Sequence, residues 1–163
     1  MSKTLIAYFS CSGVTKKVAE LLATIVDGDL YEIVPETPYT QEDLDWNDPN
    51  ARSTVEMHDM DSRPIIKGKV NNMKSYDTVF IGFPIWWYIA PTIINTFLES
   101  YDFSNKTVIP FATSGMSGVG KTDQWLHRSC SSETLWKPAI RFSNRINEKQ
   151  LSEWVKNLDL KLD

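Results

Sequence analysis

The chain has little cysteine, no long hydrophobic run and no excess of basic charge. Its two cysteines, Cys11 and Cys130, are too few for the disulfide framework of a small secreted domain, so reduced thiols in a cytoplasm are expected. The apolar run at residues 4–9 is shorter than the core of a signal peptide, and no stretch reaches the length of a membrane span. The net charge of −4 leaves no basic surface for nucleic acid or anionic lipid. We therefore expect a cytoplasmic protein that binds neither nucleic acid nor a membrane.

Strand patterns and helix patterns alternate along the sequence. The length of 163 residues suits one domain, taken here as residues 1–163. Short runs rich in β formers predict strands at residues 3–9, 29–34, 77–83, 106–112 and 138–143. Apolar residues at helical spacing predict helices at residues 14–26, at residues 93–101 after Pro91, at residues 121–130 and at residues 147–158. Right-handed crossovers turn this order into an α/β fold, a doubly wound parallel sheet with helices on both faces and ligand loops at the carboxyl ends of its strands.

The connection at residues 35–76 is unusually long for such a fold. Four prolines interrupt it, and its first half is rich in acidic residues. Long connections in compact domains are often functional, so this segment is expected to form a wall or lid of the site.

The first strand is followed by a loop suited to an anion. Residues 10–15 open the first helix, where free backbone N–H groups and the helix dipole favour negative charge. The hydroxyls of Ser10, Ser12 and Thr15 add donors, and Gly13 allows close backbone approach. The loop therefore predicts a phosphate site, against the alternative of a helix cap with incidental serines.

Two further loops predict contacts to a flat ring. Residues 82–88 place Trp86, Trp87 and Tyr88 directly after a buried strand, where all three side chains cannot point inward. The alternative is a small apolar cluster under the long connection. Residues 112–120 combine three glycines with three hydroxyls, a backbone-rich surface that can bond to a ring edge.

Together, the three motifs resemble those of the flavodoxin-like FMN-binding family, particularly its short bacterial members. The resemblance implies a five-stranded sheet of order 2-1-3-4-5, with FMN as cofactor. It assigns the phosphate to the first loop and the isoalloxazine ring to the other two. The residues that it implies for cofactor binding are Ser10, Ser12, Gly13, Val14, Thr15, Pro84, Ile85, Trp86, Trp87, Thr113, Ser114, Gly115, Ser117 and Gly118. The chain departs from the family at Val14, where Asn is common, and at Met116, where Gly is common.

Competing readings remain for three other patterns. Residues 115–122 match the nucleotide-binding P-loop pattern GxxxxGKT after a predicted strand, although no strand ends in an Asp suited to hold Mg²⁺. Cys11 stands where small tyrosine phosphatases carry their nucleophile, but Lys17 replaces the arginine that clamps the phosphoryl group. The helix start next to Cys11 could lower the pKa of its thiol. A metal site at His58, Asp59 and Asp61, or at His127 and Cys130, is disfavoured, and no metal or catalytic residue is assigned.

The predicted function is that of an FMN-binding redox protein. It would either transfer electrons to a redox partner protein or reduce a quinone-like acceptor with electrons from a nicotinamide cofactor. A P-loop nucleotide-binding protein and a non-enzymatic, flavin-binding regulatory protein are the alternatives. Neither ring loop contains an acidic residue, so the reduction potential should be less extreme than in strongly acidic carriers.

Overall fold

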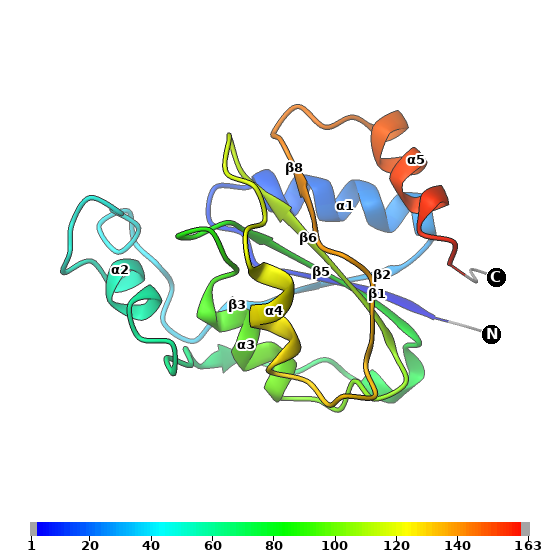
Figure 1. Cartoon of the computed structure of the whole chain (residues 1–163), viewed down its shortest axis with the longest axis horizontal. Coiled ribbons are helices and arrows are strands. Elements are labelled where there is room, and N and C mark those ends of the chain that lie inside the picture. Colours follow the sequence, from blue (N-terminus) through cyan, green and yellow to red (C-terminus); the bar gives the residue numbers. More distant parts are fainter. Residues whose placement is uncertain (1–2, 161–163) are drawn as a thin grey trace.

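The computed structural model describes residues 3–160 and has a parallel β-sheet at its centre (Figure 1). The strands of this sheet are β1 (Thr4–Tyr8), β2 (Asp29–Glu32), β5 (Thr78–Pro84), β6 (Thr107–Thr113), β7 (Leu135–Trp136) and β8 (Ile140–Phe142). Their order is β2-β1-β5-β6-β7, and β8 pairs with β6 as well. In chain order the main strands follow 2-1-3-4-5, which confirms the predicted doubly wound α/β architecture.

The last strand is the main departure from the predicted elements. Instead of one strand at residues 138–143, β7 pairs with the first residues of β6 and β8 with its last residues. Pro138 separates the two pieces and has no N–H to donate. The N–H of Ala139 bonds to the Asp123 carboxylate, at 3.0 Å from Oδ1, and not to β6. The backbone thus leaves the sheet for a few residues and then rejoins it.

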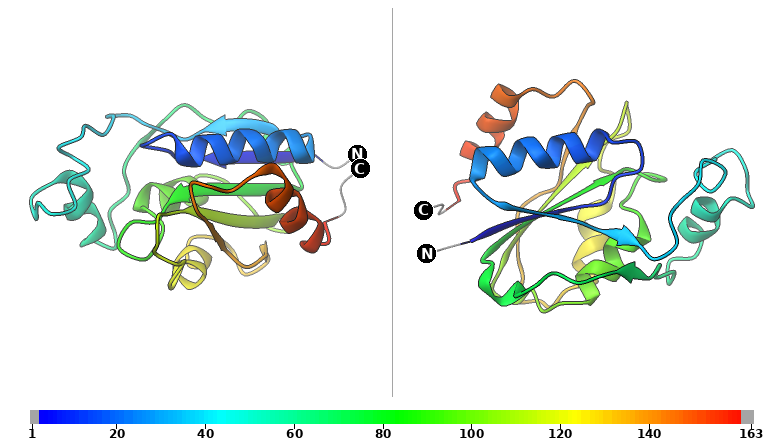
Figure 2. Two further views of the ribbon diagram at one scale, coloured as in Figure 1. Left: turned by 90° about the horizontal axis from the view of Figure 1, so that it is seen from above. Right: turned by 180° about the vertical axis from the view of Figure 1, so that it is seen from behind.

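Helices cover both faces of the sheet, as Figures 1 and 2 show. The helices α1 (Val14–Val26) and α5 (Glu148–Asn157) lie over one face, and α3 (Thr92–Glu99) and α4 (Thr122–His127) over the other. Side chains alternate between the two layers, so Ile6 packs with α1 and α5 while its neighbour Leu5 packs with α3 and α4. The apolar runs in the strands exist because both faces are buried. Within residues 3–160, none of the helices has the length and apolar character needed to cross a membrane.

A long arm leaves the body after the second strand. The predicted strand 29–34 ends at Glu32, and β3 (Val34–Pro35) instead pairs with β4 (Ile66–Lys67) in a separate antiparallel ribbon. We call residues 36–65, between these two strands, the arm. It contains the short helix α2 (Arg52–Met57) and projects beyond one edge of the body (Figures 1 and 2). The 3₁₀ turn η1 (Met73–Ser75) completes the connection to β5.

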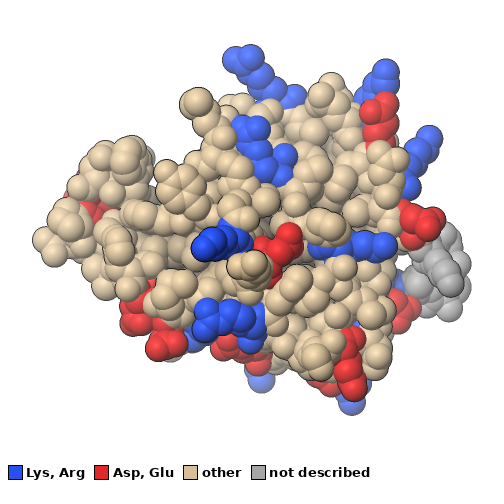
Figure 3. All heavy atoms as spheres, viewed as in Figure 1, with Lys and Arg blue, Asp and Glu red and all other residues tan. Residues whose placement is uncertain are grey.

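The arm differs from the body in charge. It holds eight acidic residues and two basic ones, a net charge of −6, so the rest of the chain carries +2. Figure 3 shows acidic side chains at the margin of the arm, while most basic side chains of that view lie over the body.

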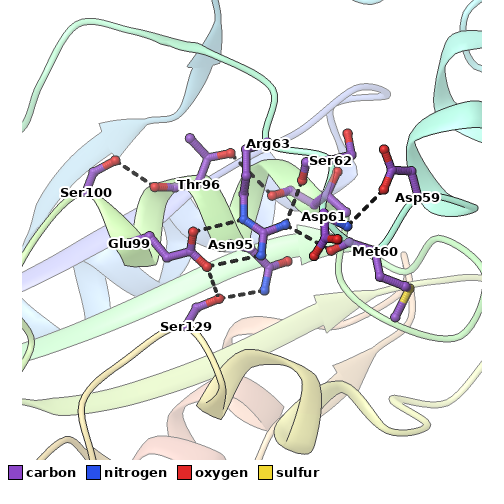
Figure 4. Close-up of polar contacts among 11 residues, drawn as sticks. Asp59, Met60, Asp61, Ser62, Arg63, Asn95, Thr96, Glu99, Ser100 and Ser129 are labelled. Carbon is purple, nitrogen blue, oxygen red and sulfur yellow. Dashed lines mark hydrogen bonds and ion pairs between the residues drawn. The ribbon is translucent and has the colours of Figure 1, made fainter.

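Hydrogen bonds hold the carboxyl-terminal end of the arm against α3 (Figure 4). The Arg63 guanidinium donates to both carboxylate oxygens of Glu99, at 2.9 and 3.1 Å. Ser129 donates to the same carboxylate, at 2.8 Å, and accepts from the Asn95 amide, at 2.9 Å. These bonds fix where the arm returns to the body.

Candidate functional site

The amino end of α1 is prepared for an anion. Gly13 precedes the helix with φ of 90°, a left-handed conformation that favours glycine, and its N–H donates to the Ser10 hydroxyl, at 3.1 Å. Within the part of the chain that the structure describes, no side chain caps α1, and its first turn contains no acidic residue. The first backbone N–H groups of the helix and its dipole therefore remain for a ligand.

A pair of threonines joins the first loop to the third. Thr15 and Thr113 are almost fully buried, and their hydroxyl oxygens lie 2.7 Å apart, although the two residues are 98 positions apart in the chain. One hydroxyl donates to the other, so the second hydroxyl hydrogen remains for another acceptor.

The loop after β5 folds back in a two-residue turn. The backbone groups of Trp86 and Ile89 bond reciprocally, at 2.9 and 3.1 Å, and Trp87 and Tyr88 between them both have positive φ, 48° and 68°. Two consecutive left-handed residues are the mark of a type I′ turn, which glycine and asparagine usually occupy. Aromatic residues in this conformation are strained, and strain of this kind gathers at functional sites.

The two neighbouring indoles have different surroundings. Trp86 packs edge-on against Phe9 and Tyr39, with ring centroids 5.6 and 5.4 Å away. It therefore belongs in part to the apolar cluster that was the alternative for this loop. Trp87 meets the His58 ring of the arm, at a centroid distance of 6.0 Å, and Tyr88 is 70% exposed.

Arg141 of β8 holds the third loop. Its guanidinium donates to the hydroxyl and the carbonyl of Ser114, at 3.1 Å each, and to the Gly115 carbonyl, at 2.5 Å. At the far end of this loop, Gly120 has φ of 55°, and a Cβ there would overlap the Tyr88 carbonyl oxygen. The second and third loops are thus in direct backbone contact.

A cavity of about 620 Å³ lies between these loops and the arm. This volume is in the range of small-molecule and cofactor sites. Six of the predicted cofactor residues line it, namely Ser12, Pro84, Ile85, Trp86, Trp87 and Ser117. The other lining residues are Cys11, Leu44, Trp46, Ser53 and Tyr88. All of these side chains are uncharged when the Cys11 thiol is protonated.

The other predicted cofactor residues lie around this cavity without being part of its lining. Ser10 and Gly13 shape the first loop, Thr15 and Thr113 form the buried pair, and Ser114, Gly115 and Gly118 belong to the third loop. Val14 faces a separate groove of about 240 Å³ between α1 and the segment after β8.

Sequence patterns did not single out the arm residues of the cavity. Leu44, Trp46 and Ser53 show no motif, and only the length of the connection indicated a wall. Ser53 is 2% exposed, and its hydroxyl has no hydrogen-bond partner among residues 3–160.

The prediction of a lowered pKa for Cys11 is wrong. Desolvation raises the pKa of its thiol to about 11, and the Arg52 guanidinium offsets this only in part. Arg52 is itself engaged, 3.9 Å from the centre of the Tyr39 ring and 3.0 Å from the Glu56 carboxylate. The Tyr39 hydroxyl donates to the same carboxylate, and burial together with this bond holds the pKa of Tyr39 well above its usual range. At neutral pH the Cys11 thiol is therefore protonated and a poor nucleophile.

The geometry also weighs against a nucleotide site at residues 115–122. The Thr122 side chain is fully buried, and its hydroxyl donates to the Val119 carbonyl, at 2.5 Å. It is not available to Mg²⁺, as the P-loop pattern requires. Across residues 3–160, no three His, Cys, Asp or Glu side chains gather in a way that could hold a metal ion.

The features of the site fit a phosphorylated, ring-bearing cofactor. The uncapped α1 provides N–H groups for a phosphate, and the cavity with its indoles provides room and apolar surface for a ring. A Cβ at Gly13, Gly115 or Gly118 would meet nothing within 4 Å, so the backbone of these loops is open to a ligand. Fold and site together define a flavoprotein of the doubly wound α/β class.

The family model described as Flavodoxin matches residues 3–158. The chain therefore belongs to the flavodoxin family, which confirms the resemblance seen in its three loops. A search among curated proteins finds no match.

Solved structures support the same assignment. A candidate flavoprotein from Bacteroides eggerthii is 48% identical, with a TM-score of 0.92, and the match covers 99% of this chain and 100% of that one. A candidate flavoprotein from Bacteroides uniformis is 46% identical, with a TM-score of 0.90 over 95% and 98% of the two chains. The flavoprotein from Lactobacillus acidophilus, solved in complex with FMN, is 24% identical, with a TM-score of 0.70 over 95% and 99%.

Proposed function

We propose that this protein is an FMN-dependent oxidoreductase that passes electrons from a nicotinamide cofactor to a neutral, quinone-like acceptor. Family membership and the FMN complex of the Lactobacillus acidophilus neighbour support FMN as the cofactor. The observation that carries the enzymatic part is the cavity of about 620 Å³, which the arm closes on one side with uncharged side chains. A carrier that meets its partner at an exposed ring edge does not require such a chamber.

When bound, FMN supplies the redox chemistry, because its ring takes up and releases electrons. The chain provides the rest. The amino end of α1 binds the phosphate, and the third loop, held by Arg141, presents backbone groups to the ring. Trp87 packs near the ring, and the arm excludes water from the space beside it.

The proposal is tested with the purified protein and added FMN. We expect a yellow protein with flavin absorbance that oxidises NADH or NADPH only when a quinone is present. A protein that binds FMN without such turnover would not be this enzyme, and failure to bind FMN together with Mg²⁺-dependent ATP binding would favour the nucleotide site.

The net charge of the arm favours a second candidate, an electron carrier with a basic protein partner. A charge of −6 beside the cavity would steer a positively charged partner toward the ring. Electron transfer to such a partner would slow markedly as salt is added, whereas reduction of a neutral quinone would not.

A further inference from the structure

A second groove lies beside the amino end of α1, and no step of the proposed function uses it. Its volume of about 240 Å³ is below the usual range for complete cofactors, so it suits one part of a larger molecule. Four of its lining side chains come from α1 and two from the segment after β8, namely Val14, Lys17, Val18, Leu21, Asn144 and Ile146. Figures 1 and 2 show this segment beside the amino-terminal half of α1.

The first loop separates this groove from the larger cavity. Cys11 and Ser12 line the cavity, whereas Val14 and Lys17, slightly further along the chain, line the groove. The amino end of α1, with its N–H groups available for a phosphate, lies between the two. A flavin whose ring occupies the cavity and whose phosphate binds at this helix end therefore reaches the entrance of the groove.

The wall that α1 contributes is an apolar stripe. Its residues follow the spacing i, i+3, i+4 and i+7, which places them on one side of the helix. From Val14 to Leu21 the stripe extends about 10 Å, since each helical residue adds about 1.5 Å. Leu21 and Ile146 face each other across the groove and are only partly buried, so apolar surface remains for a ligand. Val14 adds to this surface at a position where the family commonly has Asn.

The two polar side chains of the groove have distinct capacities. Lys17 is exposed, no acidic residue lines the groove, and the ion pairs found among residues 3–160 do not include Lys17. Its ammonium group is therefore available to an anion near the amino end of α1. The Asn144 amide provides a donor and an acceptor, the combination that pairs with the edge of adenine. A cation, an apolar stripe and an amide together suit an adenosine phosphate.

We propose that this groove binds the adenosine monophosphate half of FAD, so that the protein accepts FAD as well as FMN. The flavin phosphate binds at the amino end of α1, the second phosphate lies against Lys17, and the adenine packs on the stripe with its edge toward Asn144. The inference rests on the proposed function for the place of the ring and of the first phosphate. It adds a binding site for the second half of a larger cofactor.

The test compares the affinities of the flavin-free protein for FMN and FAD, measured by calorimetry. The two ligands are matched, because FAD differs from FMN only by the added adenosine monophosphate group. The variants are Lys17→Gln, Asn144→Ala and the combination of both. Lys16→Gln is the matched control, since Lys16 is an exposed neighbour of equal charge that does not line the groove.

We expect each single variant to weaken FAD binding by roughly two- to fivefold, because exposed polar and charged contacts are individually weak. The losses should multiply in the combined variant. FMN affinity should stay at the wild-type level in Asn144→Ala, and in Lys17→Gln it should change no more than in Lys16→Gln. Equal losses for the two flavins, or unchanged FAD affinity in the combined variant, would overturn the inference.

Two further results separate this inference from its alternatives. If the wild type binds FMN but not FAD, while adenosine monophosphate binds to the FMN-loaded protein, the groove belongs to a separate nucleotide and the inference is wrong. FMN binding and quinone reduction without FAD binding would reject the groove and leave the proposed function intact. If the wild type binds neither flavin, the proposed function itself fails.

Discussion

The body and the arm of this molecule are stabilised in different ways. The body has two continuous apolar layers, one on each face of the sheet. The arm has one short helix and four exposed large apolar residues, Trp46, Val55, Met60 and Ile65. It contacts the body through the Arg63–Glu99 ion pair and through the aromatic contacts of Tyr39 with Trp86 and of His58 with Trp87. A rigid body suits the fixed contacts of a cofactor, and an arm with few buried contacts can open locally to admit a second ligand. Each prediction below tests this division.

The largest effect is expected in the body, for Thr15→Ala. If the free hydroxyl hydrogen of the Thr15 and Thr113 pair bonds to the FMN phosphate, its loss weakens FMN by about 10- to 150-fold, since bonds to charged groups are worth roughly 1.5–3 kcal/mol. Riboflavin, which lacks the phosphate, should bind the variant as it binds the wild type. Thr24→Ala is the control, because the Thr24 hydroxyl bonds to the Glu20 carbonyl on the exposed side of the same helix. Similar losses for both flavins would place the phosphate elsewhere.

Trp87 tests whether the ring lies against the strained turn. Removing its indole should weaken FMN by an amount comparable to base–aromatic stacking, ~1–3 kcal/mol. An aromatic face favours the electron-poor oxidised flavin, so Trp87→Ala should also raise the midpoint potential and reduce quenching of flavin fluorescence. Trp136→Ala is the control, because Trp136 pairs near the opposite end of β6. If the variant has the FMN affinity, the fluorescence quenching and the midpoint potential of the wild type, the indole contributes to the fold and not to the cofactor site.

Breaking the arm clamp should have a smaller effect. Arg63→Gln removes a partly exposed ion pair, so the free energy of global unfolding should fall by less than about 1 kcal/mol, while amide exchange in the arm accelerates. FMN affinity, a property of the body, should not change. Arg145→Gln, at an exposed position after β8, is the control.

The same clamp predicts a pH dependence. The bonds from Arg63 and Ser129 hold the pKa of Glu99 below its usual value. The clamp is therefore fully effective above the unfolded pKa of glutamate, about 4.3, and is lost as the pH falls through the lower pKa of the folded state. The difference in arm exchange between wild type and Arg63→Gln should vanish on acidification. A difference that persists in acid would mean that the ion pair does not hold the arm.

The smallest effect is expected for Cys11→Ser. The raised pKa keeps the thiol protonated at neutral pH, so it should alkylate slowly and its replacement should leave FMN affinity unchanged. Phosphatase activity in the wild type that disappears in this variant would contradict the flavoprotein assignment.

The sequence predicted the body well because its signals are local. The runs at residues 77–83 and 106–112 coincide with β5 and β6 within a residue, since strands buried on both faces must be continuously apolar. Pro138 marks the division of the last strand in the sequence. The bond from Ala139 to Asp123 that accompanies it involves a different element, and it leaves no trace in the strand pattern.

The residues of the site likewise fall into those that local sequence signals predict and those that they do not. Ser12, Pro84, Trp87 and their neighbours could be predicted because each follows a strand directly, and strand ends gather at one edge of the sheet. Leu44, Trp46 and Ser53 could not be predicted, because no motif marks them and only the folding of the arm brings them to the cavity. The direction of the Cys11 pKa shift was missed for a similar reason, since the desolvation that raises this pKa arises in the folded chain and leaves no pattern in the sequence.

The contact between Gly120 and the Tyr88 carbonyl has a consequence for protein engineering. No residue with a Cβ fits at position 120 while the turn at residues 86–89 keeps its shape, so each loop constrains the other. A graft of the third loop that places any residue other than glycine at position 120 should therefore distort the turn at residues 86–89. The two loops form a single transplantable module, although residues 89–111, with helix α3 and most of strand β6, separate them in the chain.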